Sequence, residues 1–197
     1  MAGPLPLHFT RSATSVRDLP DSVVELALVG RSNVGKSSLL NALSRRRDLA
    51  RTSKTPGSTR AVNVFELDPV GSGRWIVDLP GYVFARSSHA ERRTWQQLVE
   101  GYLTKRAALD SVLLLIDGEI GPTPLDLQTV EWLHHIGRPV RYVATKSDKV
   151  RSSKRPARRA AVAAALGVER GDVTWVSART GAGVDVLQAQ VHDLLAG

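Results

Sequence analysis

At residues 30–38 the sequence reads Gly30-Arg31-Ser32-Asn33-Val34-Gly35-Lys36-Ser37-Ser38. A largely apolar run, residues 23–29, precedes this stretch, and residues 39–43 continue it with a helix-like pattern. Gly-x-x-x-x-Gly-Lys-Ser between a strand and a helix is the setting of a phosphate-binding loop. Glycines are needed there because a Cβ would keep backbone N–H groups from wrapping a phosphate. The stretch therefore predicts a nucleoside triphosphate site, and it disfavours the alternative of a glycine-bearing turn with an incidental lysine.

Two side chains of this stretch have specific expected roles. Lys36 is expected to contact the β- and γ-phosphates, and the Ser37 hydroxyl is expected to bind Mg²⁺. The helix that begins near Lys36 would point its positive end at the same phosphates. We therefore expect all nine residues, from Gly30 to Ser38, to line the nucleotide.

Length and composition favour one soluble, cytoplasmic domain without a membrane partner. The chain has 197 residues, of which 42% are hydrophobic and 23% are charged. Its longest apolar run, residues 112–116, is too short to cross a bilayer. The sequence contains no cysteine, which excludes disulfides, thiolate metal sites and prenyl or palmitoyl anchors, and Ala2 after Met1 excludes myristoylation.

The formal net charge of +8 indicates a polyanionic partner. The most basic part of the chain is residues 149–159, and a second basic run is Arg45-Arg46-Arg47. Solubility alone can also produce such a charge, and either run can be a solvated helix end. We favour binding to RNA phosphates and do not expect a DNA partner.

Strand and helix patterns alternate along the chain. Strands are expected at 61–67, 74–77, 112–116, 140–144 and 173–176 in addition to 23–29, and helices with one apolar face at 95–103, 127–136 and 184–195. The turn at 69–73 makes the strands at 61–67 and 74–77 an antiparallel hairpin. The predicted fold class is a three-layer α/β fold, with a mostly parallel central sheet, one antiparallel strand and helices on both faces.

The domain organisation expected is an N-terminal extension, residues 1–20, followed by a single nucleotide-binding domain, residues 21–197. The extension is expected to begin disordered and to add an edge strand near residues 8–13, in preference to being a transit peptide. Residues 48–60 have no periodicity, and a loop of that length is uncommon unless it is functional.

Further motifs follow other strands, at the sheet edge where ligands bind in such folds. Asp78-Leu79-Pro80-Gly81 supplies a carboxylate for the Mg²⁺ sphere and a flexible glycine amide for the γ-phosphate. Alone this motif is weak, because Asp, Pro and Gly are common in ordinary turns. Its position directly after the 74–77 strand strengthens the prediction that it binds the ligand.

Thr145-Lys146-Ser147-Asp148 follows the 140–144 strand and indicates which base is bound. A carboxylate accepts from both N1–H and the 2-amino group of guanine, whereas adenine lacks that donor pair. The stem of Lys146 is expected to lie over the base and brace the phosphate-binding loop. Ser177-Ala178-Arg179, after the last strand, would add a backbone amide to the guanine O6.

Together these motifs resemble the translation-factor-related class of P-loop GTPases, and within it the EngB (YihA/YsxC) family. The resemblance covers roughly residues 8–195, and its most specific part is Thr52-Ser53-Lys54-Thr55-Pro56-Gly57. It implies a GTPase switch in bacterial large-subunit assembly that is linked to normal cell division and septation. It also implies that Thr59 binds Mg²⁺ only in the GTP state, within a nucleotide-binding segment made of Gly57, Ser58, Thr59, Arg60 and Ala61. Ser58 and Val83-Phe84 depart from the family pattern without removing a ligand.

The expected reaction is slow GTP hydrolysis, with Lys36, Thr59 and Gly81 as its catalytic residues. Signalling GTPases carry a water-orienting glutamine after the glycine of the Asp-x-x-Gly motif, and this chain has Tyr82 there. A partner or a monovalent cation is therefore expected to complete the site. Asn33 resembles the asparagine with which some related GTPases hold K⁺, and a turn-capping amide is the alternative.

The expected partners are GTP or GDP and the large ribosomal subunit precursor with its rRNA, and the protein is expected to be monomeric. One alternative is a general P-loop ATPase or kinase acting on a small molecule. A membrane-trafficking switch is disfavoured, because no lipid anchor site was found.

Overall fold

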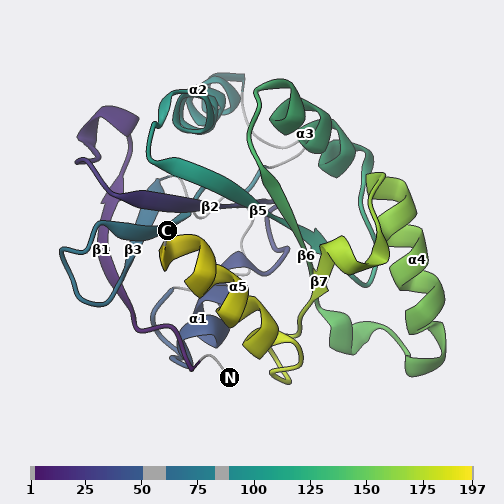
Figure 1. Cartoon of the computed structure of the whole chain (residues 1–197). Coiled ribbons are helices and arrows are strands. Elements are labelled where there is room, and N and C mark those ends of the chain that lie inside the picture. The colour runs from purple at the N-terminus through teal and green to yellow at the C-terminus, as the bar shows by residue number, and fades with distance from the viewer. Residues whose placement is uncertain (1–2, 51–60, 83–88, 197) are drawn as a thin grey trace.

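The computed structural model describes residues 3–50, 61–82 and 89–196, and for residues 89–96 it describes the backbone only. The described residues form one seven-stranded sheet in the order β1-β3-β4-β2-β5-β6-β7 (Figure 1). The strands are β1 Leu7–Ala13, β2 Val24–Gly30, β3 Val62–Leu67, β4 Arg74–Asp78, β5 Leu109–Asp117, β6 Val140–Thr145 and β7 Val173–Trp175.

One strand, β3, runs against the others. It pairs antiparallel with β1 on one side and with β4 on the other, whereas the pairs from β4 through β2, β5 and β6 to β7 are parallel. The turn between β3 and β4 is too short for a crossover helix, so those two strands form a hairpin. The predicted fold class is confirmed.

The N-terminal stretch is part of the sheet. β1 occupies the edge beside β3, with Leu7 opposite Leu67 and Ala13 opposite Val62. Leu5 and Leu7 are buried, and the Leu5 amide donates to the Leu43 carbonyl. This segment therefore contributes side chains to the hydrophobic core on one face of the sheet, and it also adds a strand to the edge of the sheet.

Helices cover both faces of the sheet. The α-helices are α1 Lys36–Ser44, α2 His89–Lys105, α3 Pro124–His135, α4 Arg155–Leu166 and α5 Val184–Ala196. Residues of α2, α3 and α4 pack into one core cluster, and residues of α1 and α5 pack into the cluster on the other face (Figure 1). Strands β2 and β5 are buried on both faces, which explains their continuous apolar runs. Among the described residues, no helix is both long and apolar enough to span a membrane.

The parallel strands place the motif-bearing segments at one edge of the sheet. β2 ends at Gly30, β4 at Asp78, β5 at Asp117 and β6 at Thr145. Strands that share a direction in one sheet bring their carboxyl ends together, so four loops separated in the sequence lie side by side. Residues 51–60 of the predicted 48–60 loop lie outside the described residues, and the side chain of Trp95 is likewise not described.

Candidate functional site

The phosphate-binding loop connects the end of β2 to the first turn of α1. Gly35 precedes α1 with φ +113°, a conformation that glycine adopts readily because it has no Cβ. A Cβ on Gly30 would come within 2.9 Å of both the Leu115 carbonyl oxygen and a methyl of Val34. Both glycines are therefore required by the backbone path, and the amides of the first turn of α1 face the mouth of this loop.

Lys36 and Asp78 are buried at the base of this loop. Burial lowers the pKa of Lys36, and the charge of Asp78 opposes that effect. Burial raises the pKa of Asp78 to about 6, and Lys36 opposes this shift. Asp78 Oδ1 is buried without a hydrogen-bond partner in the described part of the chain. Such an oxygen needs a cation or a donor to compensate for its lost hydration.

The residues present fit a magnesium ion. Mg²⁺ in phosphate-transfer sites is held by one or two protein oxygens together with phosphate oxygens and water. Asp78 Oδ1 offers an unpaired oxygen for that donor set. Ser37, in the first turn of α1, carries the second oxygen that the sequence predicts for this site.

Gly81 lies directly against the phosphate-binding loop. A Cβ at this position would come 2.8 Å from the Ser32 nitrogen and 3.0 Å from Lys36 Nζ. The next residue, Tyr82, forms an isolated parallel bridge with Arg31, and its carbonyl accepts from the Ser32 amide at 3.2 Å. On the other side of Pro80, Leu79 is buried, and its amide donates to the Leu28 carbonyl at 3.2 Å. The Asp78–Gly81 segment is therefore held beside β2 and the loop that follows it.

The 145–148 motif meets the phosphate-binding loop through Thr145. Its Oγ1 donates to the Val34 carbonyl at 2.7 Å and is 3.1 Å from the Ile116 carbonyl. Lys146 has a left-handed backbone (φ +55°), and its Nζ lies 2.6 Å from Asp117 Oδ2. Bracing of the loop, which was expected of Lys146, is thus performed in this structure by the Thr145 hydroxyl, while Asp117 holds the lysine.

Asp148 is held from the last loop. Its Oδ1 accepts from Ser177 Oγ at 2.5 Å, and its Oδ2 lies 2.7 Å from Arg179 Nε. The Ser177 hydroxyl and, after it, the Arg179 guanidinium lower the pKa of this carboxyl against the opposing effect of burial. The Ser147 amide donates to the Val176 carbonyl, which ties the two loops together. Asp148 is thereby kept ionised, with further lone pairs on both oxygens for a donor pair.

A cavity of about 980 Å³ lies between the phosphate-binding loop and the loop that carries Asp148. The phosphate-binding loop and α1 line it with Val34, Gly35, Ser38 and Arg45 to Arg47. The end of β6 and the segments that follow β6 and β7 line it with Thr145, Lys146, Asp148, Ala178 and Arg179. Segments more than 100 residues apart in the sequence therefore border one space. A ligand with a phosphate group at one end and a base at the other could contact the phosphate-binding loop and Asp148 at the same time.

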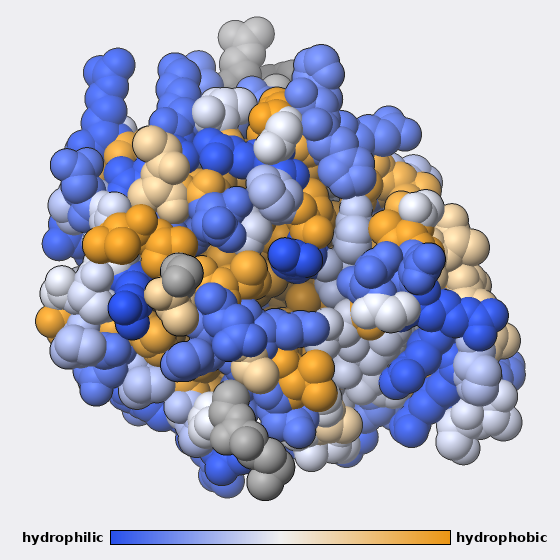
Figure 2. All heavy atoms as spheres, in the orientation of Figure 1, coloured by the Kyte–Doolittle hydropathy of each residue, from blue (hydrophilic) through white to orange (hydrophobic). Residues whose placement is uncertain are grey.

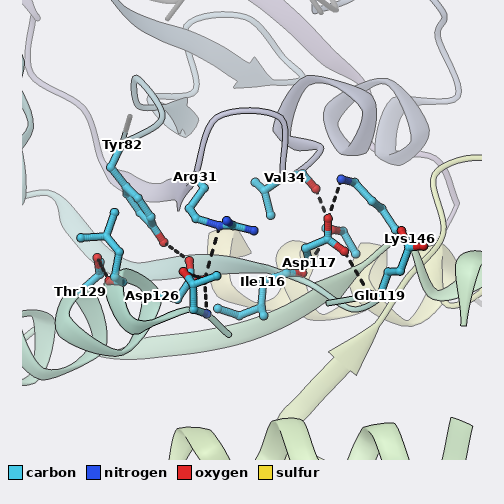
Figure 3. A network of polar contacts seen from close by, with 12 residues as sticks. Arg31, Val34, Tyr82, Ile116, Asp117, Glu119, Asp126, Thr129 and Lys146 are labelled. Atoms are coloured by element: carbon cyan, nitrogen blue, oxygen red, sulfur yellow. Dashed lines mark hydrogen bonds and ion pairs between the residues drawn. The ribbon is translucent and has the colours of Figure 1, made fainter. Parts of the chain in front are cut away.

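The remaining predicted residues are placed as follows. Asn33 is exposed in the loop with φ +63°. Arg31 extends from the loop to Asp126, with Nε 3.5 Å from Oδ2 (Figure 3). Ala61 is half-buried just before β3. Gly57, Ser58, Thr59 and Arg60 lie outside the described residues.

Sequence reasoning missed three polar residues of this region. Asn41 of α1 holds the start of the 48–60 loop, since its Oδ1 accepts from the Ala50 amide at 2.7 Å and its Nδ2 donates to the Arg47 and Ala50 carbonyls. Asp117 holds Lys146, and its place after an apolar strand was the available signal. Asp126 contacts both Arg31 and Tyr82, and Thr123-Pro124-Leu125-Asp126 carries only the signature of a helix cap.

Comparisons with known proteins agree on one family. Residues 25–146 match the family described as 50S ribosome-binding GTPase. A relative from Symbiobacterium thermophilum, named probable GTP-binding protein EngB, is 42% identical over 212 residues, covering 90% of this chain and 91% of the relative. A relative of the same name from Pelotomaculum thermopropionicum is 50% identical over 149 residues, covering 75% of this chain and 74% of its own.

Solved structures share the fold. The crystal structure of a probable GTP-binding protein engB has a TM-score of 0.69 at 22% identity and covers 88% of this chain and 99% of its own. A structure of Era in complex with MgGDPNP and nucleotides 1506–1542 of 16S ribosomal RNA has a TM-score of 0.68 at 24% identity, over 89% of this chain and 58% of its own. Both likenesses concern the arrangement of strands and helices.

Proposed function

The chain belongs to the EngB family of GTP-binding P-loop GTPases, and on that premise we propose that it is a slow GTPase switch in assembly of the large ribosomal subunit. One observation in the structure supports this proposal in addition to the family membership. The phosphate-binding loop, the buried Asp78 and the Asp148 loop converge at one edge of the sheet, and the first and last of these border a single cavity. That space receives a nucleotide with its phosphates at α1 and its base at Asp148.

In this site GTP binds with its phosphates against residues 30–38. Lys36 contacts the β- and γ-phosphates, and the Gly81 amide donates to the γ-phosphate. Ser37 and Asp78 would hold Mg²⁺, and the ion would offset phosphate charge when bound. Thr59 would join the metal ligands in the GTP state, which would make residues 57–61 one part of the switch. The other part is the phosphate-binding loop, residues 30–38.

Guanine selection rests on Asp148, which Ser177 and Arg179 keep ionised and oriented. Replacing Asp148 with Asn exchanges one acceptor oxygen for an NH₂ donor, which suits the carbonyl that xanthine carries in place of the 2-amino group. We expect D148N to lose GTP affinity by about a hundredfold or more and to gain affinity for xanthosine triphosphate. Competition binding with both nucleotides measures this. A D148N protein that keeps guanine preference, or a parent protein that binds ATP as tightly as GTP, would favour the alternative of a small-molecule kinase or ATPase.

Intrinsic turnover is expected to be slow, because no water-orienting glutamine follows Gly81. The Tyr82 phenol is buried and donates to Asp126 Oδ1 at 2.7 Å, so it points to the start of α3 (Figure 3). Asn33 is the residue proposed to hold K⁺ beside the phosphates, with a turn-stabilising amide as the alternative. We expect faster turnover in KCl than in NaCl at equal ionic strength, and the N33A variant should abolish that difference. Equal rates in the two salts would remove K⁺ from the mechanism.

The proposed partner is the large-subunit precursor and its rRNA. A second cavity, of about 530 Å³, lies beside the loop that carries Asp148. It is lined by Arg155, Arg159, Arg170 and Arg179 together with Trp175. Arg159 lies over the Trp175 ring at 5.6 Å, and Figure 2 shows strongly hydrophilic residues gathered on the side of the molecule where Figure 1 places α4. Guanidinium groups match phosphate geometry, so this surface is suited to an RNA backbone. The likeness in fold to Era, whose structure was solved with ribosomal RNA, adds to this proposal.

The experiment is co-sedimentation from a cell lysate with the protein loaded with a non-hydrolysable GTP analogue or with GDP. We expect it to travel with large-subunit precursors in the GTP-like state and to be released in the GDP state. We also propose that the protein is cytoplasmic and monomeric, and that a requirement in cell division and septation would follow from the loss of ribosomes. Association that ignores the nucleotide, or no association with particles at all, would contradict the ribosomal role.

A further inference from the structure

Asp126 lies at the start of α3, and its contacts go beyond those of a helix cap. The residue is fully buried, and its Oδ2 accepts from the Thr123 amide at 2.7 Å and the Thr123 hydroxyl at 2.6 Å. Those two bonds cap the helix. Its other oxygen, Oδ1, accepts from the Tyr82 hydroxyl at 2.7 Å, and Arg31 Nε lies 3.5 Å from Oδ2. One carboxylate thus joins α3, the phosphate-binding loop and the residue after Gly81 (Figure 3).

The backbone repeats the same connection. Arg31 and Tyr82 form a parallel bridge, and the Ser32 amide donates to the Tyr82 carbonyl at 3.2 Å. The two residues whose side chains converge on Asp126 are therefore also paired through their main chains. Burial and the Asp126 charge raise the pKa of Tyr82, so the phenol stays protonated and keeps donating. Together these contacts hold Tyr82 at its backbone and at the far end of its side chain.

Gly81 is one peptide bond from Tyr82. Glycine has the largest backbone freedom of any residue, so the direction of its N–H depends on what holds its neighbours. Leu79, two residues before Gly81, is held by the core and by the Leu28 carbonyl, and Tyr82, directly after Gly81, is held by Asp126. A donor that is held before the phosphate arrives stabilises developing charge without reorganising.

We propose that Asp126 is a positioning residue for GTP hydrolysis, which acts through Tyr82 to aim the Gly81 amide at the γ-phosphate. The proposal rests on the proposed role of Gly81. It assigns the two oxygens of Asp126 to two different tasks: Oδ2 caps α3, and Oδ1 holds Tyr82. GDP has no γ-phosphate, so losing the second task should affect GTP and leave GDP binding nearly unchanged.

The Tyr82→Phe variant removes only the hydroxyl and leaves the buried ring in place. We expect the ratio of GTP to GDP affinity to fall by about threefold to tenfold and turnover at saturating GTP to fall by a similar factor, because a buried hydrogen bond to a carboxylate is lost. GDP affinity should change by less than about twofold, since the contacts of the phosphate-binding loop remain. Nucleotide titrations and single-turnover hydrolysis measure these quantities.

The matched control is Tyr142→Phe. Tyr142 on β6 is also buried, and its hydroxyl lies 3.2 Å from His134 Nε2 of α3, so Y142F likewise removes a phenol contact to this helix. It should leave the affinity ratio and turnover at parent values. If Y82F and Y142F both leave the ratio unchanged, or if Y82F weakens GTP and GDP equally, Asp126 has no positioning role.

A second variant separates positioning from helix capping. Asp126→Asn is expected to lower thermal stability and also the ratio of GTP to GDP affinity. The double variant Y82F/D126N should have the same ratio as D126N alone, because both changes break the same Tyr82–Asp126 bond. Losses that add in the double variant would overturn the proposal. Gly81→Ala tests the underlying assumption, since its Cβ would lie 2.8 Å from the Ser32 nitrogen. If G81A keeps the parent ratio, the proposed role of Gly81 fails instead.

Discussion

Asp78 shows how one residue can serve binding at a cost to stability. Its carboxyl is 2% exposed, and Oδ1 has no hydrogen-bond partner in the described residues. Lys36 offsets only part of the cost of burying this charge, so the pKa rises to about 6 from an ordinary value of 3.8. A cation brought in with the phosphates would compensate the same oxygen. The residue is therefore suited to the nucleotide-bound protein better than to the free one.

This predicts a pH dependence for the nucleotide-free protein in EDTA. Between about pH 4 and pH 6 the unfolded chain releases the Asp78 proton while the folded protein retains it, so the free energy of unfolding falls as pH rises through this window. The Asp78→Asn variant cannot ionise there, and at pH 7 it should be more stable than the parent by about 1–3 kcal/mol. Urea denaturation at pH 4.5 and pH 7 measures the difference.

Asp110→Asn serves as the control, because Asp110 is exposed. It should leave both the stability and its pH dependence at parent values. D78N should also lose Mg²⁺-dependent GTP hydrolysis, so the same substitution is expected to raise stability and lower activity. A D78N protein that is less stable than the parent at pH 7 would show that the Asp78 carboxylate stabilises the free fold.

At the scale of elements, the loop between β7 and α5 forms the part of the cavity where guanine is proposed to bind. Gly183 ends this loop with φ +70°, and a Cβ there would come 2.1 Å from the Trp175 carbonyl oxygen. Within the loop, the Ser177 amide donates to the Ala182 carbonyl, and the Thr180 amide donates to Ser177 Oγ. The close approach of Gly183 to β7 therefore keeps compact the loop that presents Ser177 and Arg179 to Asp148.

Gly183→Ala should consequently destabilise the protein by about 3 kcal/mol or more, because backbone must shift in addition to the left-handed strain. Gly137→Ala is the matched control. Gly137 has φ +72°, but no atom lies within 4 Å of its ideal Cβ, so only the conformational cost of about 1 kcal/mol should remain. Thermal and urea unfolding of the two variants give the difference. Equal losses would mean that the contact with β7 is easily relieved.

At the scale of the whole molecule, the net charge of +8 is not spread evenly. The cavity beside β7 gathers four arginines, of which Arg179 is paired with Asp148 and Arg155 donates to the Val150 carbonyl. A local cluster of positive charge binds a polyanion more strongly than the same charge dispersed, because several phosphates release their counterions together. The arginine-lined cavity should therefore contribute more to RNA binding than other exposed arginines.

The variant R159E/R170E tests this against R17E/R141E. All four arginines are exposed, and both pairs lower the net charge equally, but Arg17 and Arg141 do not line the cavity. We expect R159E/R170E to weaken binding to large-subunit precursors by at least about tenfold at low salt and to flatten its salt dependence. R17E/R141E should cost only a few-fold. Equal losses would mean that overall charge alone attracts the particle.

Much of this protein can be read from local pattern. Gly30, Gly35 and Lys36 follow an apolar strand, and each strand-end motif carries its own chemistry, so fold class, GTPase family and guanine preference could all be anticipated. The strands could be placed because periodicity depends on neighbouring residues alone. The antiparallel direction of β3 follows likewise from the short turn that precedes β4.

Long-range contacts could not be anticipated in this way. Thr145 rather than Lys146 reaches the phosphate-binding loop, Asp117 takes the lysine, and Asp126 joins Tyr82 to Arg31 across separations of 44 and 95 residues. Each partner is chosen by which side chains the sheet order brings within hydrogen-bond distance, and burial then makes that pairing obligatory. The sequence by itself determined the chemistry at each strand end. Only the tertiary structure decided which of those groups hold one another, because that depends on the distances set by packing.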